Sequence, residues 1–575
     1  MNAMFEQKIS LKSIRDFFDK NPKIYKMVES AALATAGVMK RFGLEIPRIP
    51  QMAYFQLLDL YNHYQKEIYY SKGSPLVLFY TPRFWNIHAV IEHTIAIGLS
   101  FSRAKCLFAN CEGFLPICNI QNIHQGLRMP CRSCIKHQQK LFQQSGFPNY
   151  SLPHFLSQDQ RAQAHKIVNS LDYKELENFS YEGIPLGKLV QVSTRWFLTA
   201  TDIAGSKQGL EVYRNFVISA IIVSDVAKNL LKNVRPDVIF LLNGLFFEER
   251  IICSWAERLL IPFVTYENGF MKNSFVFARN SIACYYDISE HWPSVKNRPL
   301  STKENEWLDN YLIDRQVGNR AIIQYWPKRE ERITAIKRKL NLDGAKKIVV
   351  AFTNIIWDSA VQERDIGFAG MFKWLSQIIA FFSRHREYQF IIRIHPAEIR
   401  LKGRETKEGA AQFIRSAFSE LQSNIQIVLP DSKISSYRLI EISDLILTYT
   451  STIGLEAALM GKPVMVAGQT HYRGKGFTLD TDTEAEYLDR LIEVLKMTKN
   501  EINVDVQSAR RYSFLFFRRY MLDFSTIINH EKSSKLHLNI ENLPDLKSKR
   551  HSILNTVARF ILETRNPSDH QALIL

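Results

Sequence analysis

Three consecutive hydroxyl side chains, Thr450, Ser451 and Thr452, stand where a short apolar run gives way to a predicted helix. The helix start carries Gly454, and Glu456 follows one turn further on. A free helix N-terminus with hydroxyl neighbours attracts phosphate groups. A carboxylate one turn into such a helix can reach the two hydroxyls of a ribose. We therefore predict that these five residues hold the diphosphate and ribose of a nucleotide.

A histidine ends another predicted strand of the same region. The apolar run 389–394 leads into His395, and Pro396 stops the strand and fixes a turn. A histidine in this place can donate a hydrogen bond to a phosphate or carboxylate oxygen. The alternative is a turn histidine that the backbone satisfies. Ligands collect at the carboxyl ends of parallel strands, which favours the ligand-binding interpretation.

More polar side chains follow the predicted strand 347–352. Asn354 and Asp358 would line the same cleft and bind a sugar, or they would cap the next helix. The basic, glycine-rich loop 471–478 could close over a diphosphate, although turns use the same residues. The complete predicted donor-binding set is Asn354, Asp358, Arg393, His395, Thr450, Ser451, Thr452, Gly454, Glu456 and Tyr472.

These side chains need sheets to position them, and apolar runs that alternate with helical segments predict two. The later sheet has strands predicted at 347–352, 389–394, 425–428, 444–447 and 463–467. The earlier one has strands predicted at 75–80, 105–109, 238–242 and 262–266. Two segments have a similar pattern, Pro236-Asp-Val-Ile-Phe and Ser443-Asp-Leu-Ile-Leu, and each is followed by a predicted loop and helix. Two domains of similar fold would produce such a repeated pattern. The predicted fold class is α/β, with two Rossmann-like domains facing a cleft.

The earlier domain offers a candidate general base. Glu267 ends the strand 262–266 and is followed by Gly269, so we expect its carboxylate to point into the cleft. A carboxylate within hydrogen-bond reach of a hydroxyl can take its proton during an attack on carbon. The alternative is a capping or ion-paired glutamate. Glu267 and His395 are the predicted catalytic residues, and the reserve candidates for the base are Glu92, His93, Asp202 and Glu248.

The composition is that of a globular protein with several domains. The chain has 575 residues, of which 46% are hydrophobic and 23% charged, and this excludes a disordered protein. We predict a helical extension over 1–72, an α/β domain over 73–286, a helical connection over 287–344, a second α/β domain over 345–480, and C-terminal helices and a tail over 481–575.

The net charge of +17 has three interpretations: a basic solvated surface, an anionic substrate or an anionic membrane face. Nucleic acid is disfavoured, because the basic residues are dispersed and no recognition motif is present. No apolar run reaches the roughly 18 residues that span a bilayer. The first residues lack the apolar core of a signal peptide. We therefore expect a cytoplasmic protein.

The segment 510–520 combines two arginine pairs with aromatic residues. At helical spacing Phe514, Phe517 and Met521 share one side. This pattern predicts a closing helix packed on the body of the protein. The alternative is peripheral docking on the anionic inner face of a membrane, where a lipid-linked acceptor would lie.

Four cysteines have the spacing C-x6-C-x12-C-x2-C, and they are Cys111, Cys118, Cys131 and Cys134. A tight C-x2-C pair is typical of tetrahedral thiolate sites, although the first pair is wider than usual. Two interpretations remain open. One is a structural zinc or iron–sulfur site, and the other is a group of reduced cysteines packed in a core.

Three motifs together resemble the bacterial capsule polysaccharide biosynthesis proteins, a group related to the Kdo transferases of capsule assembly. They are His-Pro-x-Glu at 395–398, Ser-Thr-x-Gly-x-Glu-Ala at 451–457, and Gly-Lys-Pro-Val at 461–464 with a downstream Tyr472 and Gly-Phe-Thr. The likeness covers about 345–480 and extends more weakly over 75–285. Residues 140–235 depart from the pattern, which leaves the acceptor open.

The resemblance implies a GT-B fold, donor binding by the C-terminal domain, and transfer that needs no metal or other cofactor. We therefore predict a glycosyltransferase of surface polysaccharide assembly. Its donor would be a nucleotide sugar, with a CMP-linked acidic sugar favoured, and its acceptor a glycan or a lipid-linked sugar. The alternatives are a polyol-phosphate transferase of the teichoic-acid type, a sugar-nucleotide epimerase, and a glycan-assembly subunit without catalysis.

Overall fold

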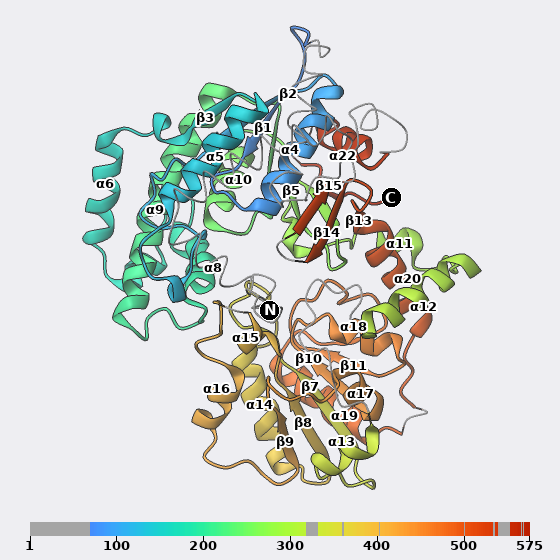
Figure 1. Ribbon diagram of the computed structural model, residues 1–575. Helices are drawn as coiled ribbons and strands as arrows, with labels where there is room; N and C mark the ends of the chain where they lie inside the picture. Colours follow the sequence, from blue (N-terminus) through green and yellow to red (C-terminus); the bar gives the residue numbers. More distant parts are fainter. Residues whose placement is uncertain are drawn as a thin grey trace, which may run out of the picture.

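The chain folds around two large β-sheets, and helices cover both faces of each (Figure 1). The computed structural model describes residues 70–317, 332–358, 361–401, 403–498, 501–532, 535–538, 552–564, 566 and 568–575. The predicted extension over 1–72 therefore lies almost wholly outside the described residues, as does the part of the predicted connection at 318–331. In the described part of the chain, every helix is too short or too polar to cross a membrane.

The first sheet has the order β13-β6-β5-β4-β1-β2-β3, and β16 pairs with β6. The neighbours from β3 to β5 are parallel, whereas β6 is antiparallel to β5, β13 and β16. Alternate residues of one strand serve opposite faces. Leu78 packs toward α8–α10, and Val77 packs toward α4 and α22. The strands are β1 (Leu76–Tyr80), β2 (Lys105–Asn110), β3 (Asn149–Ser151), β4 (Val238–Leu242), β5 (Phe263–Asn268), β6 (Ser274–Arg279), β13 (Leu522–Asp523) and β16 (Gln571–Ala572).

The second sheet has the order β12-β11-β10-β7-β8-β9, and all its strands are parallel. From β7 the chain moves outward through β8 to β9, and it then crosses back to β10 on the other side of β7. The strand order therefore reverses between β7 and β10. The strands are β7 (Ile348–Phe352), β8 (Gln389–Arg393), β9 (Ile425–Val428), β10 (Leu445–Thr448), β11 (Val464–Val466) and β12 (Leu479–Asp480).

The helices form layers on the sheets. In the first domain they are α4 (Asn86–Phe101), α5 (Cys131–Ser145), α6 (Gln158–Asn169), α7 (Tyr173–Glu177), α8 (Leu186–Leu198), α9 (Lys207–Val234) and α10 (Phe247–Arg258). Along the chain, the strands of the first sheet up to β6 are followed by α11 (Trp292–Val295), α12 (Thr302–Val317) and α13 (Ile333–Lys339), before the second sheet begins. The second domain contains α14 (Met371–Arg384), α15 (Ala397–Arg400), α16 (Ala410–Ala417), α17 (Ser436–Ile442), α18 (Ile453–Leu459) and α19 (Glu484–Lys496). Further on are α20 (Val506–Phe514), a π-helix (Leu515–Tyr520), a hairpin of β14 (Ile528–Lys532) and β15 (Lys535–Leu538), and α22 (Ser552–Leu562).

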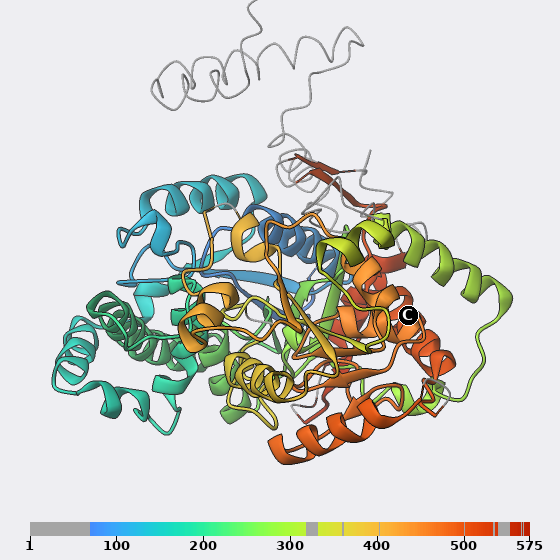
Figure 2. The same cartoon turned by 90° about the horizontal axis from the view of Figure 1, so that it is seen from below.

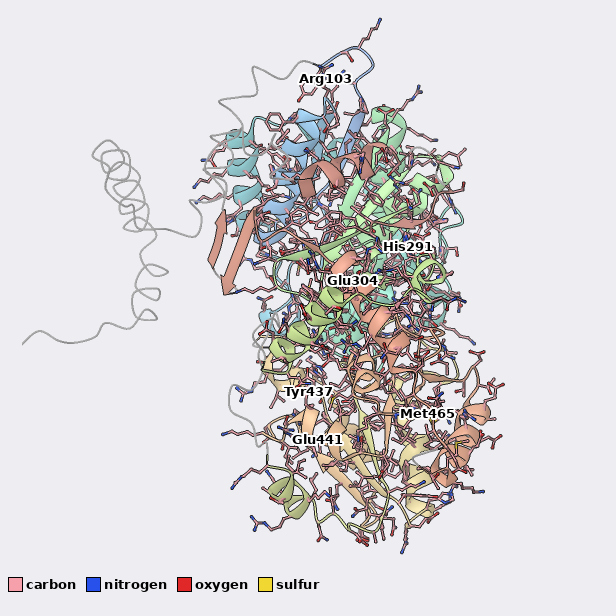
Figure 3. The ribbon with its side chains drawn as sticks, turned by 90° about the vertical axis from the view of Figure 1, so that its right-hand side faces the viewer. Arg103, His291, Glu304, Tyr437, Glu441 and Met465 are labelled. Carbon is pink, nitrogen blue, oxygen red and sulfur yellow. The ribbon has the colours of Figure 1, made fainter. Side chains whose placement is uncertain are left out.

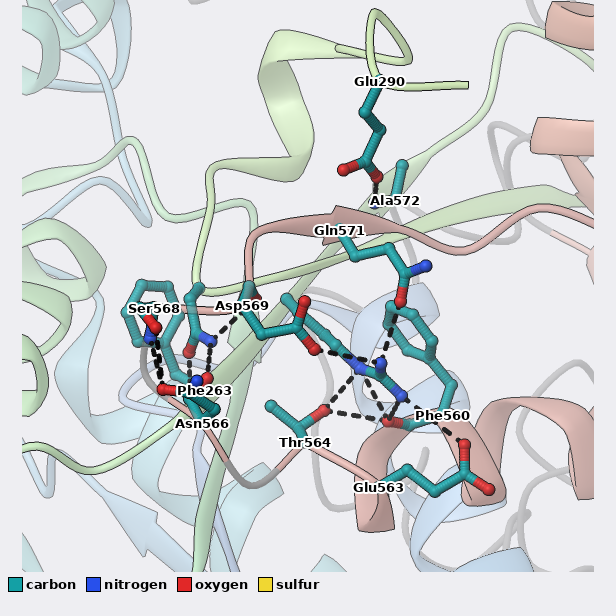
Figure 4. Close-up of polar contacts among 12 residues, drawn as sticks. Phe263, Glu290, Phe560, Glu563, Thr564, Asn566, Ser568, Asp569, Gln571 and Ala572 are labelled. Carbon is teal, nitrogen blue, oxygen red and sulfur yellow. Dashed lines mark hydrogen bonds and ion pairs between the residues drawn. The ribbon is translucent and has the colours of Figure 1, made fainter. Parts of the chain in front are cut away.

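The C-terminal part of the chain returns to the first domain. β13 and β16 both pair with β6, and α22 packs against α4. The Arg279 guanidinium, on β6, donates to the carbonyl of Phe560, to Thr564 Oγ1 and to Gln571 Oε1. Figure 4 shows these side chains converging from α22 and the segment after it. The predicted unit 481–575 is thus divided between the two domains.

The segment 510–520 forms α20 and the π-helix. Phe517 and Met521 are buried in the hydrophobic core that lies beneath α12, α18 and α20, and Phe514 is buried against Trp307 of α12. Arg510 pairs with Asp309 on α12. The apolar side is therefore occupied by protein, as the closing-helix interpretation predicts, and it is not open to a bilayer.

The two domains are stacked with the carboxyl ends of their parallel strands toward each other (Figures 1 and 2). In the side view of Figure 3, Arg103 marks the far end of the first domain, and Tyr437 and Met465 lie in the second. Side chains connect the domains directly: Arg195 Nη1 donates to Gln362 Oε1 over 2.7 Å. This confirms the predicted fold class of two α/β domains that face each other.

Candidate functional site

Three loops of the second domain meet where its strand order reverses. Asn354 follows β7, and its Nδ2 donates to Oγ1 of Thr450, after β10, over 3.2 Å. Thr353 Oγ1 accepts a hydrogen bond of 3.0 Å from the backbone N–H of His395, after β8. In an open α/β sheet, the crevice at such a reversal is where ligands bind. The structure therefore brings together Asn354, His395 and Thr450, which the sequence assigned to one site.

His395 is half-buried and neutral at physiological pH. Burial, and then the positive charge of Arg393, lower the pKa of its ring to about 4. Its Nδ1 accepts a hydrogen bond of 3.1 Å from the backbone N–H of Ala397. The ring proton is therefore assigned to Nε2. The backbone contacts one nitrogen, as the turn interpretation holds, and a protonated Nε2 has the chemistry of a donor to a phosphate or carboxylate oxygen.

Glu456 is buried in α18 and already has protein partners. Its Oε1 accepts from Arg315 Nε over 2.6 Å, and its Oε2 accepts from the hydroxyl of Tyr437. Arg315 comes from α12, and sequence reasoning missed both partners. The pair links the connecting helix to the predicted nucleotide loop. The role of Glu456 at a ribose stays a prediction.

Gly454 and Tyr472 fit together beneath the loop. A Cβ at position 454 would lie 2.2 Å from the Tyr472 hydroxyl oxygen, so only glycine fits there without rearrangement. That hydroxyl donates to the carbonyl of Ser451 over 2.7 Å. Thr452 is the N-cap residue of α18, but its side chain makes no capping hydrogen bond. Gly454 and Tyr472 thus shape the loop that carries the hydroxyls.

Arg393 is buried and turned toward a neighbouring loop. Its Nη1 donates to the carbonyl of Leu429 over 2.7 Å, and its Nη2 donates to that of Ser432 over 3.3 Å. Burial lowers the pKa of the guanidinium to about 10. In this structure Arg393 stabilises the loop after β9. Its positive charge acts on the site by lowering the pKa of His395.

Glu267 lies opposite the second domain. It is half-buried at the end of β5, and its Oε1 accepts from the backbone N–H of Asn268 over 2.7 Å. Burial raises its pKa to about 6, and the negative charge of Asp358, from the other domain, adds to this rise. Two predicted residues from different domains therefore interact electrostatically across the domain interface. A carboxylate with this pKa is mostly ionised at neutral pH and can accept a proton.

Each reserve candidate for the base makes contacts of its own. Glu248 pairs with the buried Arg83, and Glu92 accepts from the Tyr266 hydroxyl over 2.8 Å. His93 Nδ1 lies 2.9 Å from the carbonyl of Ala89. Asp202 Oδ1 accepts from the backbone N–H of Gly205. These contacts favour structural roles for the reserve group.

The four cysteines of the predicted metal site lie in one region of the first domain. Cys111, Cys118 and Cys134 all lie close enough to Glu248 for its charge to raise their pKa values, although burial is the larger cause. A Cβ at Gly113 would lie 3.5 Å from the sulfur of Cys131. Within the described residues, however, no three His, Cys, Asp or Glu side chains are arranged to hold a metal ion. The structural metal stays a prediction, and the structure gives it no support.

Sequence reasoning missed the aromatic and cationic residues at the domain interface. Arg364 lies 4.0 Å from the ring centroid of Tyr285, and the Tyr285 hydroxyl donates to Glu363 Oε2 over 2.9 Å. Trp196 and Trp357 meet edge to face with ring centroids 5.4 Å apart. Single residues in loops leave no periodic signal, so only the folded structure reveals these pairs.

The sequence comparison confirms the predicted resemblance over part of the chain. Residues 290–502 match the family described as capsule polysaccharide biosynthesis protein. The matched segment contains β7 to β12 and the loops that bring Asn354, His395 and Thr450 together. The weaker likeness predicted over 75–285 lies outside it. No curated protein matches the chain.

Several solved structures are similar to this chain at low identity. KpsC, the β-Kdo 2,7 transferase of Thermosulfurimonas dismutans, is 16% identical with a TM-score of 0.32, covering 54% of this chain and 85% of its own. The UDP-GlcNAc 2-epimerase of Neisseria meningitidis is 12% identical with a TM-score of 0.23, covering 77% and 99%. A glycosyltransferase of Rickettsia africae is 10% identical with a TM-score of 0.25, covering 85% and 99%.

Proposed function

We propose that this chain, whose residues 290–502 match the capsule polysaccharide biosynthesis family, is a glycosyltransferase of surface polysaccharide assembly. It would transfer a sugar from a nucleotide-activated donor to a glycan or lipid-linked acceptor. One observation carries the proposal. The matched segment places Asn354, His395 and Thr450 at a strand-order reversal, opposite a carboxylate of the other domain.

The second domain supplies groups suited to the donor. Hydroxyl and N–H groups at the end of a strand can bind a phosphate through hydrogen bonds. Such binding does not require a metal site. The neutral imidazole of His395 donates from Nε2 to a phosphate oxygen as the bond to the sugar breaks. Thr450 and Asn354 hold the same group in place. We expect this transfer to proceed without a metal ion, as the family resemblance implies.

The first domain supplies the base. Glu267 accepts the proton of the acceptor hydroxyl while that oxygen attacks the anomeric carbon and the nucleotide leaves. The carboxylate is poised by partial burial, which raises its pKa to about 6. Asp358 lies close enough to affect that pKa, and it is suited to bind a hydroxyl of the sugar between the two domains.

We favour a donor that carries an extra negative charge, such as a CMP-linked acidic sugar. Arg364 supports this choice. It is half-buried, lies over the ring of Tyr285, and makes no salt bridge within the part of the chain that the structure describes. Its backbone carbonyl accepts from Gln469 N–H in the loop after β11, which places the residue beside that basic loop. A half-buried cation that makes no salt bridge suits an anionic ligand, although the charges of Asp287 and Glu363 also act on Arg364.

A lipid-linked acceptor would require the protein to reach a membrane. Phe514 and Phe517 are buried, so such an association would rest on basic side chains and the anionic lipid surface. Flotation with vesicles of phosphatidylcholine and phosphatidylglycerol tests it. Binding that disappears at high salt supports peripheral association, and an absence of binding at low salt argues against it.

A thermal-shift screen identifies the donor class. CMP-, UDP- and GDP-sugars are compared with CDP-glycerol, first with the wild type and then with Asn354→Ala. We expect a rise in Tm with one family of nucleotide sugars that is lost in the variant. A response to CDP-glycerol alone would favour the polyol-phosphate transferase. Conversion of the donor without any acceptor would favour the epimerase, and binding without conversion or transfer would favour the non-catalytic subunit.

A further inference from the structure

Three buried N–H groups at one corner of the domain interface have no acceptor among the described residues. They are Nε of Arg195, Nε1 of Trp196 and Nη1 of Arg404. The first two residues lie near the end of α8 in the first domain, and Arg404 lies in the loop after α15 in the second. Buried donors nearly always have partners, because burying one without an acceptor is destabilising. Three in one place point to an occupant that brings acceptors.

All three donors are gathered around one loop. The guanidinium of Arg404 lies 4.7 Å from the ring centroid of Trp196, and the Trp196 ring meets Trp357 at 5.4 Å. Arg195 Nη1 donates to Gln362 Oε1 over 2.7 Å. Trp357 and Gln362 both belong to the loop after β7. The corner is therefore built by both domains. Arg195, Trp196 and Arg404 are half-buried, whereas Trp357 and Gln362 are buried.

This corner carries two positively charged side chains. Neither Arg195 nor Arg404 makes a salt bridge with any residue that the structure describes, and the hydrogen-bond partners of Arg195 are the neutral side chains of Gln191 and Gln362. Burial lowers the pKa of Arg404 with no nearby carboxylate to oppose it. Burial also lowers the pKa of Arg195, although the negative charges of Asp365, Glu177 and Glu363 oppose this. Two cations with unused N–H groups match a ligand that carries negative charge on oxygen.

The loop that carries Arg404 is held against the first domain on both sides of that residue. Asn122 Nδ2 donates to the carbonyl of Gly403 over 2.9 Å. His124 Nε2 lies 2.8 Å from the carbonyl oxygen of Glu405. The backbone N–H of Lys407 donates to the carbonyl of Thr199 over 3.0 Å. Arg404 is therefore preorganised, which reduces the entropic cost of binding a ligand.

We infer that Arg195, Trp196 and Arg404 form an oxyanion subsite for the acceptor glycan, which carries a carboxylate or phosphate on its sugar units. The inference rests on the proposed function for the identity of the ligand. Its position supports the acceptor over the donor. Trp357 immediately precedes Asp358, whose charge acts on Glu267. In Figure 1, α8 and α15 lie toward the left of the region where the two domains meet, whereas α18 lies toward the right.

Direct binding to the full chain, without any donor, tests the subsite independently of transfer. The probes are digalacturonate for carboxylate, glucose 6-phosphate for phosphate, and cellobiose as a neutral sugar, each measured by calorimetry. The variants are Arg404→Gln, and Trp196→Phe, which keeps an aromatic ring and removes the N–H. The control is Arg415→Gln, at an exposed position on α16. Thermal unfolding confirms that each variant is folded.

We expect at least one anionic probe to bind more tightly than cellobiose. Its Kd should rise about tenfold in Arg404→Gln, because a charge-assisted hydrogen bond is lost, and about threefold in Trp196→Phe. Arg415→Gln should bind as the wild type does. The anion that binds identifies the source as carboxylate or phosphate. Affinities that are equal for charged and neutral probes, or that are unchanged in both variants, would overturn the subsite.

A transfer assay separates this inference from the proposed function. In Arg404→Gln we expect KM for the acceptor to rise while KM for the donor stays unchanged. Anion binding that depends on Arg404, in a protein that never transfers a sugar, would uphold the subsite and refute the glycosyltransferase. Transfer with unchanged acceptor KM in both variants would uphold the glycosyltransferase and refute the subsite.

Discussion

Glu267 is the general base of the proposed transfer. A general base contributes about 10²- to 10⁴-fold to a rate, so Glu267→Gln should lower kcat by roughly that factor. The donor-induced rise in Tm should persist, because the residue belongs to the acceptor side. The wild-type rate should increase with pH through about 6, since burial raises the pKa to that value and only the ionised carboxylate accepts a proton.

The measurement is kcat/KM between pH 5 and 8 for the wild type and the variant. A variant that stays folded and turns over at the wild-type rate would remove Glu267 from the mechanism. A wild-type profile that is flat below pH 7 would contradict the assigned pKa. His395 adds no change in this range, because its ring is already neutral above its pKa of about 4.

Glu92 couples stability to pH. Burial raises its pKa from 4.5 to about 8, while its carboxyl accepts from Tyr266. Between those values the folded protein retains a proton that the unfolded chain has lost, so stability should fall as pH rises from about 5 to 8. Glu92→Gln mimics the protonated form and should weaken this dependence. Tm against pH measures it, with the exposed Glu211→Gln as control, and identical slopes for all three proteins would contradict the assignment.

Several site residues could be predicted from the sequence because a local rule exposes them. Pro396 ends a strand and places His395 at its carboxyl end, and a run of hydroxyls marks Thr450. The reason for Gly454 could not be predicted, since its crowding comes from Tyr472, 18 positions later. The partners of Glu456 were equally hidden, because Arg315 lies on a helix more than a hundred residues earlier.

At the scale of elements, the pair between Arg315 and Glu456 fastens α12 to α18. Both side chains are largely buried, with 17% and 6% of their surfaces exposed. Removing one partner of a buried pair leaves an uncompensated charge, so Arg315→Ala should cost about 3–5 kcal/mol. The control is Arg490→Ala, which breaks an exposed pair on α19 and should cost about 0.3–0.5 kcal/mol. Urea unfolding measures both, and equal losses would contradict a fastening role.

Arg279 holds the returning C-terminal segment on the first sheet. The planar guanidinium donates hydrogen bonds to Phe560, Thr564 and Gln571 at the same time. The single ammonium group of lysine cannot reproduce this arrangement. Arg279→Lys should therefore speed hydrogen exchange in α22. Arg559→Lys, at an exposed position of the same helix, is the control. Exchange that is unchanged in Arg279→Lys, or raised equally in both variants, would refute the anchoring role.

Long apolar strands could be predicted from the sequence, and short edge strands could not. The run 238–242 is β4 at its predicted bounds, and 425–428 is β9. β3, β12, β13 and β16 have only two or three residues each, too few to leave an apolar run. The packing of α22 against α4 depends on contacts between residues far apart in the sequence. The hydrophobic periodicity of a single segment does not predict such contacts.

At the scale of the whole molecule, the chain forms two α/β domains whose strand ends face one another. The loops of the second domain carry the side chains predicted to bind a nucleotide. From the first domain, Arg195 donates to Gln362, and Glu267 is affected by the charge of Asp358. Neither half is complete alone, because the predicted base and the predicted phosphate donors lie in different domains. The central claim is therefore that the two halves act together on one sugar.

Mass-spectrometric detection of sugar transfer tests that claim most directly. Full-length protein is incubated with the nucleotide sugar that stabilises it and an acidic oligosaccharide acceptor, beside Glu267→Gln and His395→Ala. We predict an acceptor heavier by one sugar residue with the wild type, and product formation reduced about 10²-fold or more in each folded variant. Absence of transfer by the wild type from every donor that binds, or full transfer by both variants, would contradict the account.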